Sequence, residues 1–376
     1  MQFDTFSSIN SIIEQDKADT PYKYSLLKSV IESCQEYPHY AKESGDRISL
    51  PVGLCVVKWL LYYYPFFTPG KFIVMKRGEQ NGKRQIAFRS EFEAVCRYYE
   101  EHGGISVFYD DLTFGTIPDE IQETVVSLAE KIRDTILTKP MKHLGTSQTN
   151  TKYSVFHREE KVEAFPEKSP LSIQTIIEKS GTYSISKELY IVFRELGGFI
   201  IGSGCISNKW LSFLHAQNHK LGISDAELLE RFAVEPVQER NTRTARELYL
   251  SLAKEGQCFC VWSGNTVNTS RLAVDHLIPF SIWKSNDLWN LVPADAKING
   301  KKSDMIPSRA LLTDRKESIF ALWEMLCTKY PHEFNRGLSV GLLGEEPGAD
   351  WKEQAFAKLC GISDYLIHSR GYQEWK

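Results

Sequence analysis

The stretch that decides the fold is residues 271–307, which read RLAVDHLIPFSIWKSNDLWNLVPADAKINGKKSDMIP. Asp275 and His276 are adjacent at the end of a short apolar run, and the Leu-Ile-Pro that follows is consistent with a strand that stops there. Asn290 and Asn299 follow His276 by 14 and 23 residues. Carboxylate and amide oxygens are ligands that hard divalent cations prefer, and a histidine can accept a proton near neutral pH. The stretch therefore combines side chains that metal-dependent hydrolysis requires.

This pattern resembles the HNH endonucleases of the ββα-metal superfamily. Its spacing is most similar to that of the HNH domain in the large RNA-guided CRISPR effector nucleases, including an upstream Cys-x-[Trp/Tyr]-Ser-Gly, here Cys260, Trp262, Ser263 and Gly264. The resemblance covers about 50 of the 376 residues. It implies a ββα-metal fold and hydrolysis of phosphodiester bonds, with DNA as the expected substrate.

The resemblance also implies a role for each polar residue of the motif. His276 is expected to be the general base, since an ordinary histidine pKa of about 6.5 suits that role. Asp275 and Asn299 are expected to hold a divalent cation, magnesium or alternatively manganese. Asn290 is expected to hold the His276 loop in place. Because neighbouring strand residues point to opposite faces, Asp275 and His276 can converge on one phosphate only if the chain twists or leaves regular strand geometry.

The segment after Asp295 predicts a helix with that residue at or near its N-cap. Asn299 and Lys302, three residues apart, would share a face of this helix. Lys302 is therefore expected to neutralise a phosphate beside the metal. The competing interpretation makes Asn299 a helix-ending residue, because Gly300 follows it and Asn-Gly often marks a turn.

Many HNH proteins bind a structural zinc through two Cys-x-x-Cys pairs, and this sequence lacks that arrangement. Cys258 and Cys260 form Cys-x-Cys, and no second pair lies near Asn299. A structural zinc needs four ligands in a tetrahedral array, so none is expected here. Cys260 is predicted to pack as a small buried hydrophobic residue.

The formal net charge is −3, so a chain that binds nucleic acid must concentrate its positive charge locally. The candidate phosphate contacts form three groups: Lys301, Lys302 and Arg309 around the motif; Arg240, Arg243 and Arg246 along one face of a predicted helix; and Lys76, Arg77, Lys83 and Arg84 near a hairpin tip. A solvated or salt-bridged helix face explains the three arginines equally well. A solvated hairpin is likewise the alternative for the third group.

An N-terminal hairpin is predicted at residues 72–88, where two β-prone runs flank Asn81-Gly82. Ser90 and Glu93 follow with the spacing of a capping box. Because segments of helical apolar periodicity precede the hairpin, the sequence predicts a winged-helix-like module.

The predicted fold class is α+β: mostly helical, with an embedded ββα-metal nuclease domain. Residues 1–137 are expected to form an N-terminal domain, 138–182 a polar linker, and 183–376 a helical domain that contains the nuclease core at about 256–310. Apolar periodicity predicts helices over residues 22–35, 51–64, 119–137, 186–196, 208–220, 238–254, 314–330 and 351–359. The last two are expected to brace the small nuclease unit.

Cysteine usage and the N-terminus predict a cytoplasmic protein. The eight cysteines show no disulfide-like framework, and the first residues lack a basic region followed by an apolar run. No apolar segment of membrane-spanning length occurs in the sequence. Neither a signal peptide nor a membrane partner is therefore expected.

Three functions remain open. The first is a metal-dependent DNA endonuclease, similar in architecture to bacterial restriction and phage-defence nucleases. The second is an inactive HNH-fold protein that binds nucleic acid or acts as a scaffold, and the third is an RNA-cleaving nuclease. Retention of Asp275, His276 and Asn299 argues against the second. A protein partner or a homo-oligomer is compatible with all three.

Overall fold

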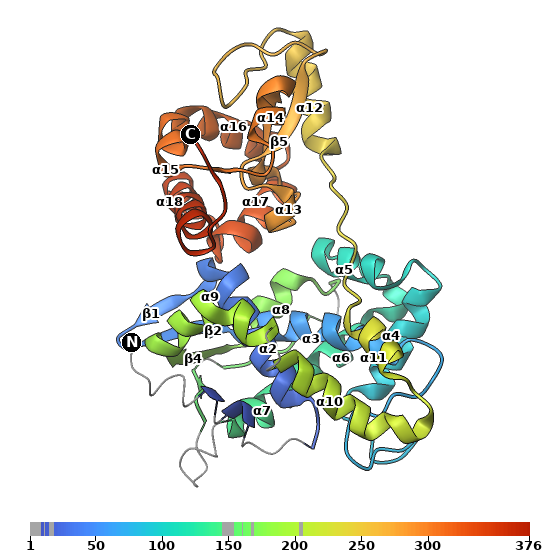
Figure 1. Ribbon diagram of the computed structural model, residues 1–376. Helices are drawn as coiled ribbons and strands as arrows, with labels where there is room; N and C mark the ends of the chain where they lie inside the picture. The colour runs from blue at the N-terminus through green and yellow to red at the C-terminus, as the bar shows by residue number, and fades with distance from the viewer. Residues whose placement is uncertain are drawn as a thin grey trace. The chain divides into compact units, whose positions relative to one another are not determined.

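The computed structural model describes residues 9–10, 12–14, 19–144, 154–159, 161–166, 169–202 and 206–376. The chain divides into two units, Met1–Val237 and Gln238–Lys376 (Figure 1). Helices dominate both units and the sheets are small, which confirms the predicted mostly helical α+β class.

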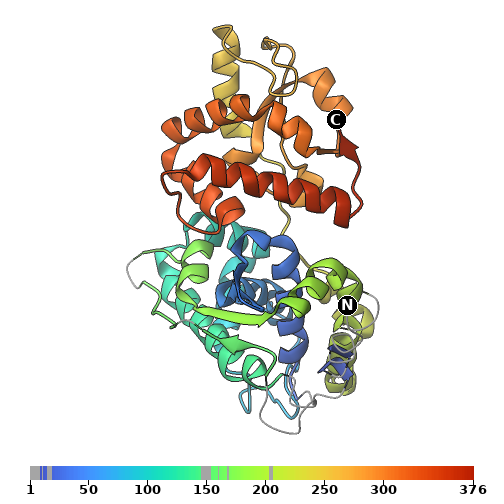
Figure 2. The same ribbon diagram turned by 90° about the vertical axis from the view of Figure 1, so that its left-hand side faces the viewer.

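The first unit packs helices against a small antiparallel sheet. Its helices are α2 (Tyr22–Glu36), α3 (Val52–Phe67), α4 (Arg89–Glu100), α5 (Gly104–Phe114), α6 (Asp119–Thr138), α7 (Pro140–His143), α8 (Ile173–Lys179), α9 (Lys187–Gly202), α10 (Ile206–Asn218) and α11 (Asp225–Phe232), with short 3-10 turns η1 (Pro38–Tyr40) and η3 (His219–Leu221). The strands β1 (Lys42–Ser44), β2 (Arg47–Pro51), β3 (His157–Arg158) and β4 (Thr182–Ser186) form a sheet in the order β1-β2-β4-β3. Figure 2 shows the green strand β4 in front of the helices of this unit.

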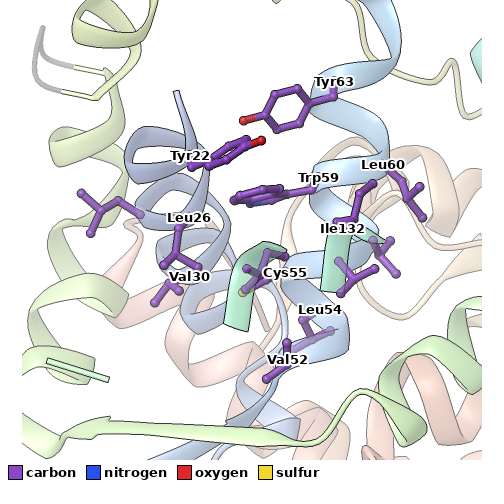
Figure 3. Close-up of a cluster of buried hydrophobic side chains, with 14 of the residues drawn as sticks. Tyr22, Leu26, Val30, Val52, Leu54, Cys55, Trp59, Leu60, Tyr63 and Ile132 are labelled. Atoms are coloured by element: carbon purple, nitrogen blue, oxygen red, sulfur yellow. The ribbon is translucent and has the colours of Figure 1, made fainter. Parts of the chain in front are cut away.

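The core of this unit is built around α3, an almost wholly apolar helix. Trp59 of α3 is completely buried and stacks on Tyr22 of α2, with ring centroids 5.5 Å apart. Figure 3 shows these two rings with Tyr63 and with aliphatic side chains of α2, α3 and α6 around them. Aromatic residues bury large apolar areas, so this cluster contributes strongly to the stability of the unit.

Most predicted helices occur, and several, such as α9, continue further than expected. The helices α2 and α6 match the predictions for residues 22–35 and 119–137. The helix predicted to end at Gly197-Gly198 instead runs to Gly202 as α9. At Gly197, an added methyl group would lie 2.3 Å from Cγ2 of Ile31 in α2. The glycine therefore permits close packing of two helices and does not terminate α9.

The predicted hairpin at residues 72–88 does not form strands, although this whole segment belongs to the described part of the chain. Within this segment, the only β-type pairing is one isolated antiparallel bridge between Gln80 and Lys83, on either side of the predicted turn. The backbone of Val74 bonds instead to a side chain: its N–H donates to Oδ1 of Asn218 at 2.7 Å, and its carbonyl accepts from Nδ2 at 3.0 Å. A side-chain amide thus takes the place of a neighbouring strand.

A buried carboxylate accounts for the remaining backbone groups of this loop. Glu79 accepts hydrogen bonds from the N–H groups of Met75 at 2.6 Å and Ile86 at 3.1 Å. Its partner is the buried guanidinium of Arg89, which also donates to the Ile73 carbonyl. Buried backbone groups require partners, and these side chains supply them without a β-ladder. The expected strands of a winged-helix-like module are therefore absent from this segment.

Helix capping in this unit differs between α11 and α4. Ser224 caps α11, where its hydroxyl accepts a hydrogen bond from the Glu227 N–H. The capping box predicted at Ser90 and Glu93 is wrong, because α4 begins one residue earlier and Ser90 lies inside it. Glu93 pairs with the buried Arg89 instead, at 3.0 Å.

The boundary between the units lies further along the chain than the predicted linker. The described parts of residues 138–182 belong to the first unit and bury Phe156, Phe165 and Leu171 in its core. The connecting segment is residues 234–242, which have no regular secondary structure and are mostly exposed. Pro and Gly content pointed to residues 138–182, but burial of their apolar side chains makes that segment part of the domain.

The second unit surrounds a two-stranded antiparallel sheet with helices. Its elements are α12 (Arg243–Lys254), β5 (Leu272–His276), α13 (Phe280–Trp283), η4 (Leu288–Asn290), β6 (Leu291–Asp295), α14 (Ala296–Lys302), β7 (Ile306–Pro307), α15 (Arg309–Asp314), α16 (Lys316–Lys329), α17 (Pro331–Leu338), the π-helical turn η5 (Ser339–Leu343), α18 (Trp351–Asp364), the π-helical turn η6 (Tyr365–Ser369) and β8 (Glu374–Trp375). β5 pairs with β6 from Leu272↔Asp295 to His276↔Leu291.

The C-terminal helices complete the core around this sheet. Trp323 of α16 is buried and donates a hydrogen bond to the Trp289 carbonyl at 2.8 Å. β8 returns to pair in parallel with β7, with Ile306 opposite Glu374. The β5–β6 pair and α14 therefore share one apolar core with the C-terminal helices, as predicted for the bracing helices.

No single helix in the described ranges is long and apolar enough to cross a membrane. Among the helices of the described ranges, one bent pair meets the length and composition criteria, namely α9 with the segment Ile206–Leu221.

Candidate active site

Two strands and a short helix bring the predicted site residues together. Asp275 and His276 end β5, and α14, which carries Asn299, starts directly after β6. Asp295 caps α14, since its carboxylate accepts a hydrogen bond from the Lys297 N–H at 2.9 Å. The predicted N-cap is thus present, and the strand–strand–helix order matches a ββα unit.

An open pocket of about 510 Å³ lies at the end of β5. It is lined by Arg240, Asp275, His276, Pro279, Phe280, Ser281, Lys284, Asn299, Gly300, Ser303 and Asp304. Asp275 and His276 line it together although they are adjacent strand residues. The Asp275 carboxylate turns toward the following residue and accepts a hydrogen bond from the His276 N–H at 2.7 Å. This turn solves the convergence problem that regular strand geometry poses.

Two buried donors hold the Asp275 carboxylate in one orientation. The indole Nε1 of Trp262 donates to Oδ2 at 2.7 Å, and the Nζ of Lys302 donates to Oδ1 at 3.2 Å. The same Nζ donates to the His276 carbonyl at 2.7 Å. The carboxylate can accept further contacts, and Asp275 lines the pocket.

The predicted role of Lys302 is corrected by this geometry. Its side chain is completely buried, and desolvation lowers the pKa of its ammonium group despite the neighbouring Asp275. The ammonium group therefore cannot reach a phosphate in the pocket. Lys302 positions Asp275 and the end of β5.

His276 presents an unpaired ring nitrogen. Its Nε2 is buried and has no hydrogen-bond partner within the described residues. The pKa of the ring is lowered to about 4, mainly by burial and then by the positive charges of Arg240 and Lys302. The nearby Asn286 side chain has a smaller, opposite effect and raises this pKa. The imidazole is consequently neutral at pH 7, as a general base must be, but its pKa lies well below the ordinary value of about 6.5 that the sequence argument assumed.

Asn290 fastens the loop that follows His276. Its Oδ1 accepts a hydrogen bond from the Ile278 N–H at 2.8 Å, and its Nδ2 donates to the Ile278 carbonyl at 3.0 Å. The Asn290 carbonyl also accepts from the Leu277 N–H at 2.8 Å. The side chain is fully buried and is not among the pocket-lining residues. The side chain therefore joins η4 to the loop after His276, and its role in catalysis stays a prediction.

The donor set suits a hard divalent cation that keeps much of its water. Asp275 supplies a carboxylate whose Oδ2 has one hydrogen-bond donor, and Asn299 supplies an amide at the pocket wall. In the described part of the chain, no three or more His, Cys, Asp or Glu side chains gather into a metal cage. Magnesium is commonly bound by one or two carboxylates plus water and substrate, so these residues fit it.

Comparison with known families assigns both units. Residues 2–232 match the family model described as a domain of unknown function, DUF8808. The chain belongs to the DUF8808 family. Residues 260–308 match the HNH endonuclease family model, and this span contains β5, β6 and α14. No curated protein matches the chain. The DUF8808 unit is thus followed by an HNH domain.

Several predicted phosphate contacts of the HNH unit have other partners. Arg309 forms an ion pair with Asp364 at 2.6 Å, and Arg243 pairs with Glu247 at 3.0 Å. Lys301 is exposed but does not line the pocket. Exposed ion pairs are weak and exchange readily, so Arg243 and Arg309 can still meet a polyanion outside the pocket.

The predicted face of three arginines is wrong. α12 begins at Arg243, so Arg240 lies before the helix in the connecting segment, and only Arg243 and Arg246 share the helix. Arg240 lines the pocket instead. Arg77, Lys83 and Arg84 of the DUF8808 unit are exposed, and Lys76 is half-buried.

Sequence reasoning missed other residues of this site. Asn286 contacts the connecting segment and His276, while Lys284 and Asp304 line the pocket. Polar residues within a loop carry no periodicity, so only the spacing of known HNH motifs could have suggested them. Cys258 and Cys260 are buried and unpaired, and Cys260 packs in the apolar core.

Proposed function

We propose that the chain is a metal-dependent HNH endonuclease that hydrolyses phosphodiester bonds in DNA, acting as a bacterial restriction or anti-phage defence effector. The unpaired Nε2 of His276 carries the proposal. A buried polar atom without a partner is unfavourable, and a catalytic role is one explanation for it. The match of residues 260–308 to HNH endonucleases supports the same reaction class.

His276 acts as the general base in this proposal. Its neutral ring takes the proton of the attacking water at Nε2, in a pocket that also presents Asp275 and Asn299. When bound by Asp275 and Asn299, magnesium or manganese supplies charge stabilisation for the scissile phosphate and the leaving 3′ oxygen. Trp262 and Lys302 hold Asp275 in its orientation, and Asn290 holds the His276 loop.

RNA cleavage is the alternative that the same site supports, because the motif residues would act on the phosphodiester group that DNA and RNA share. An inactive scaffold is less consistent with the site. Loss of activity would remove the reason to keep His276 buried and unpaired beside an oriented carboxylate.

Cleavage assays test the proposal directly. Purified protein is incubated with supercoiled plasmid, linear DNA and RNA, with EDTA, magnesium or manganese. Cleavage of DNA is expected only with a divalent cation, and His276→Ala is expected to lower the rate by about 10²–10⁴-fold. His332→Ala is the matched control, because His332 is exposed on α17 outside the pocket. A wild-type rate in His276→Ala, or no cleavage under any condition, would refute the proposal.

A further inference from the structure

We infer that Arg240 binds a backbone phosphate of the nucleic-acid substrate and that Asn286 is the residue that positions it. This inference rests on the proposed function and adds a substrate contact from outside the HNH motif. Arg240 lies in the segment that joins the two units, twenty residues before the span that matches the HNH family.

Arg240 is fixed against the strand that carries the site. Its Nη2 donates a hydrogen bond to the Val274 carbonyl at 2.9 Å, one residue before Asp275. The same side chain lines the pocket with Asp275, His276 and Asn299. A guanidinium group has five donors, and this hydrogen bond uses one of them. Further donors therefore remain for an anion in the pocket.

Asn286 holds the connecting segment on both sides of Arg240. Its Nδ2 donates to the Glu239 carbonyl at 2.8 Å, and its Oδ1 accepts from the Asn241 N–H at 2.9 Å. A single side chain thus clamps the residues immediately before and after Arg240. Asn286 also raises the pKa of the His276 ring, so it lies close to both the arginine and the proposed base.

The charges around the pocket favour an anionic ligand. Arg240 and Lys284 line it with the carboxylates Asp275 and Asp304, and the buried Lys302 lies against Asp275. The two cationic side chains of the lining therefore balance its two carboxylates, and a bound divalent cation would make the site net positive. Phosphate fits a guanidinium well, because two parallel N–H donors match two of its oxygens.

Because Arg240 lies in the segment that connects the two units, the inferred phosphate contact depends on the position of that segment. Asp275, His276 and Asn299 all lie in β5 and α14, whereas Arg240 lies in the connecting segment, which hydrogen bonds to Val274 and Asn286 hold in place. Displacement of residues 239–241 would remove the phosphate contact and leave the motif residues in place. The inferred ligand is a phosphodiester group and requires no particular base.

The test is a DNA-binding titration of the full chain in EDTA at several salt concentrations. Arg240→Gln removes the charge and keeps a similar length, and Arg240→Lys keeps the charge. The salt slope is the slope of the logarithm of the binding constant against the logarithm of the salt concentration. We expect this slope to be shallower by about 0.9 in Arg240→Gln, as for one lost phosphate contact. Its Kd should rise about 10- to 100-fold, the range for a hydrogen bond to a charged group. Arg370→Gln is the control, because Arg370 is exposed and outside the pocket lining.

Two further measurements separate binding from structural effects. In Arg240→Ala, millimolar guanidinium chloride should restore part of the cleavage rate, whereas His276→Ala should show no such rescue. Asn286→Ala should also make the salt slope shallower, because Arg240 would lose its positioning. The double variant Arg240→Gln/Asn286→Ala should have the same slope as Arg240→Gln, since the two substitutions remove the same phosphate contact. Additive slopes would overturn the positioning role of Asn286.

The outcomes distinguish this inference from the proposed function. A wild-type slope and affinity in Arg240→Gln, with wild-type protein that cleaves DNA, would overturn the inference alone. Wild-type protein that binds and cleaves no nucleic acid would refute the proposed function, and the inference with it.

Discussion

The Nζ atom of Lys302 lies 3.2 Å from Oδ1 of Asp275, and both side chains are buried. The lysine belongs to α14 and the aspartate to β5, so this contact joins the helix of the ββα unit to its first strand. Removing one partner of a buried ion pair leaves the other charge without compensation. The same contact therefore supports both the stability of the unit and the orientation of its carboxylate.

Lys302→Met is expected to lower the free energy of unfolding by about 3–5 kcal/mol, because Asp275 would remain buried without its cation. Chemical denaturation followed by tryptophan fluorescence measures this, since Trp262, Trp289 and Trp323 report on the HNH unit. Lys301→Met is the control, as Lys301 is the exposed neighbour in α14. Equal stability of the two variants would contradict the prediction.

Trp262→Phe removes the indole donor to Asp275 and keeps an aromatic ring. We expect a loss of about 1.5–3 kcal/mol, the range for a hydrogen bond to a charged group. The freed carboxylate should also require more manganese for half-maximal cleavage. Trp375→Phe is the matched control. The ring of Trp375 packs edge-on against that of Trp262, with ring centroids 5.0 Å apart, but the hydrogen bond to Asp275 comes from Trp262. The assignment fails if both variants need the same manganese concentration.

Asn290→Ala should loosen the loop after His276, because Ile278 would lose its two hydrogen bonds to this side chain. The expected cost is about 1–3 kcal/mol, with a lower cleavage rate and an unchanged affinity for manganese. Calorimetric titration with manganese and rate measurements test the two parts separately. Asn265→Ala, at an exposed loop position, should change stability by no more than about 0.5 kcal/mol. Loss of manganese binding in Asn290→Ala would instead indicate a direct role at the metal.

Protein purified without added metal is expected to contain clearly less than one zinc per chain, because a structural zinc needs four ligands. Cys258 and Cys260 are buried, and burial, with a contribution from Cys260, raises the pKa of the Cys258 thiol to about 11. Zinc binds the thiolate, which this environment disfavours. Elemental analysis decides the question. Stoichiometric zinc that is lost in Cys258→Ser would show the prediction to be wrong.

Lys83 and Arg84 are predicted to form a second contact with DNA from the DUF8808 unit. Replacing both with alanine should weaken binding similarly for different sequences and make the salt slope shallower by up to about two units. Cleavage of saturating substrate should be unchanged. Binding titrations at several salt concentrations compare this variant with Lys42→Ala, an exposed lysine of β1. Identical slopes would show that the loop at residues 76–84 is only a solvated surface.

Local patterns in the sequence predicted much of the secondary structure. Helical periodicity located α2, α6 and the bracing helices, since an apolar face repeats along a helix wherever it packs. Asp295 was recognised as an N-cap because that interaction lies within one turn. The hairpin at residues 72–88 was mispredicted because its backbone partners, Arg89 and Asn218, come from other elements.

The sequence by itself determined which residues could perform phosphodiester chemistry, because the HNH pattern is a matter of residue type and spacing within about 50 residues. Only the tertiary structure decided what each of them contacts. It buried Lys302 against Asp275, left Nε2 of His276 unpaired and brought Arg240 from the connecting segment to the pocket. Burial and long-range hydrogen bonds depend on how β5, α14 and the connecting segment pack, and spacing along the chain does not contain that information.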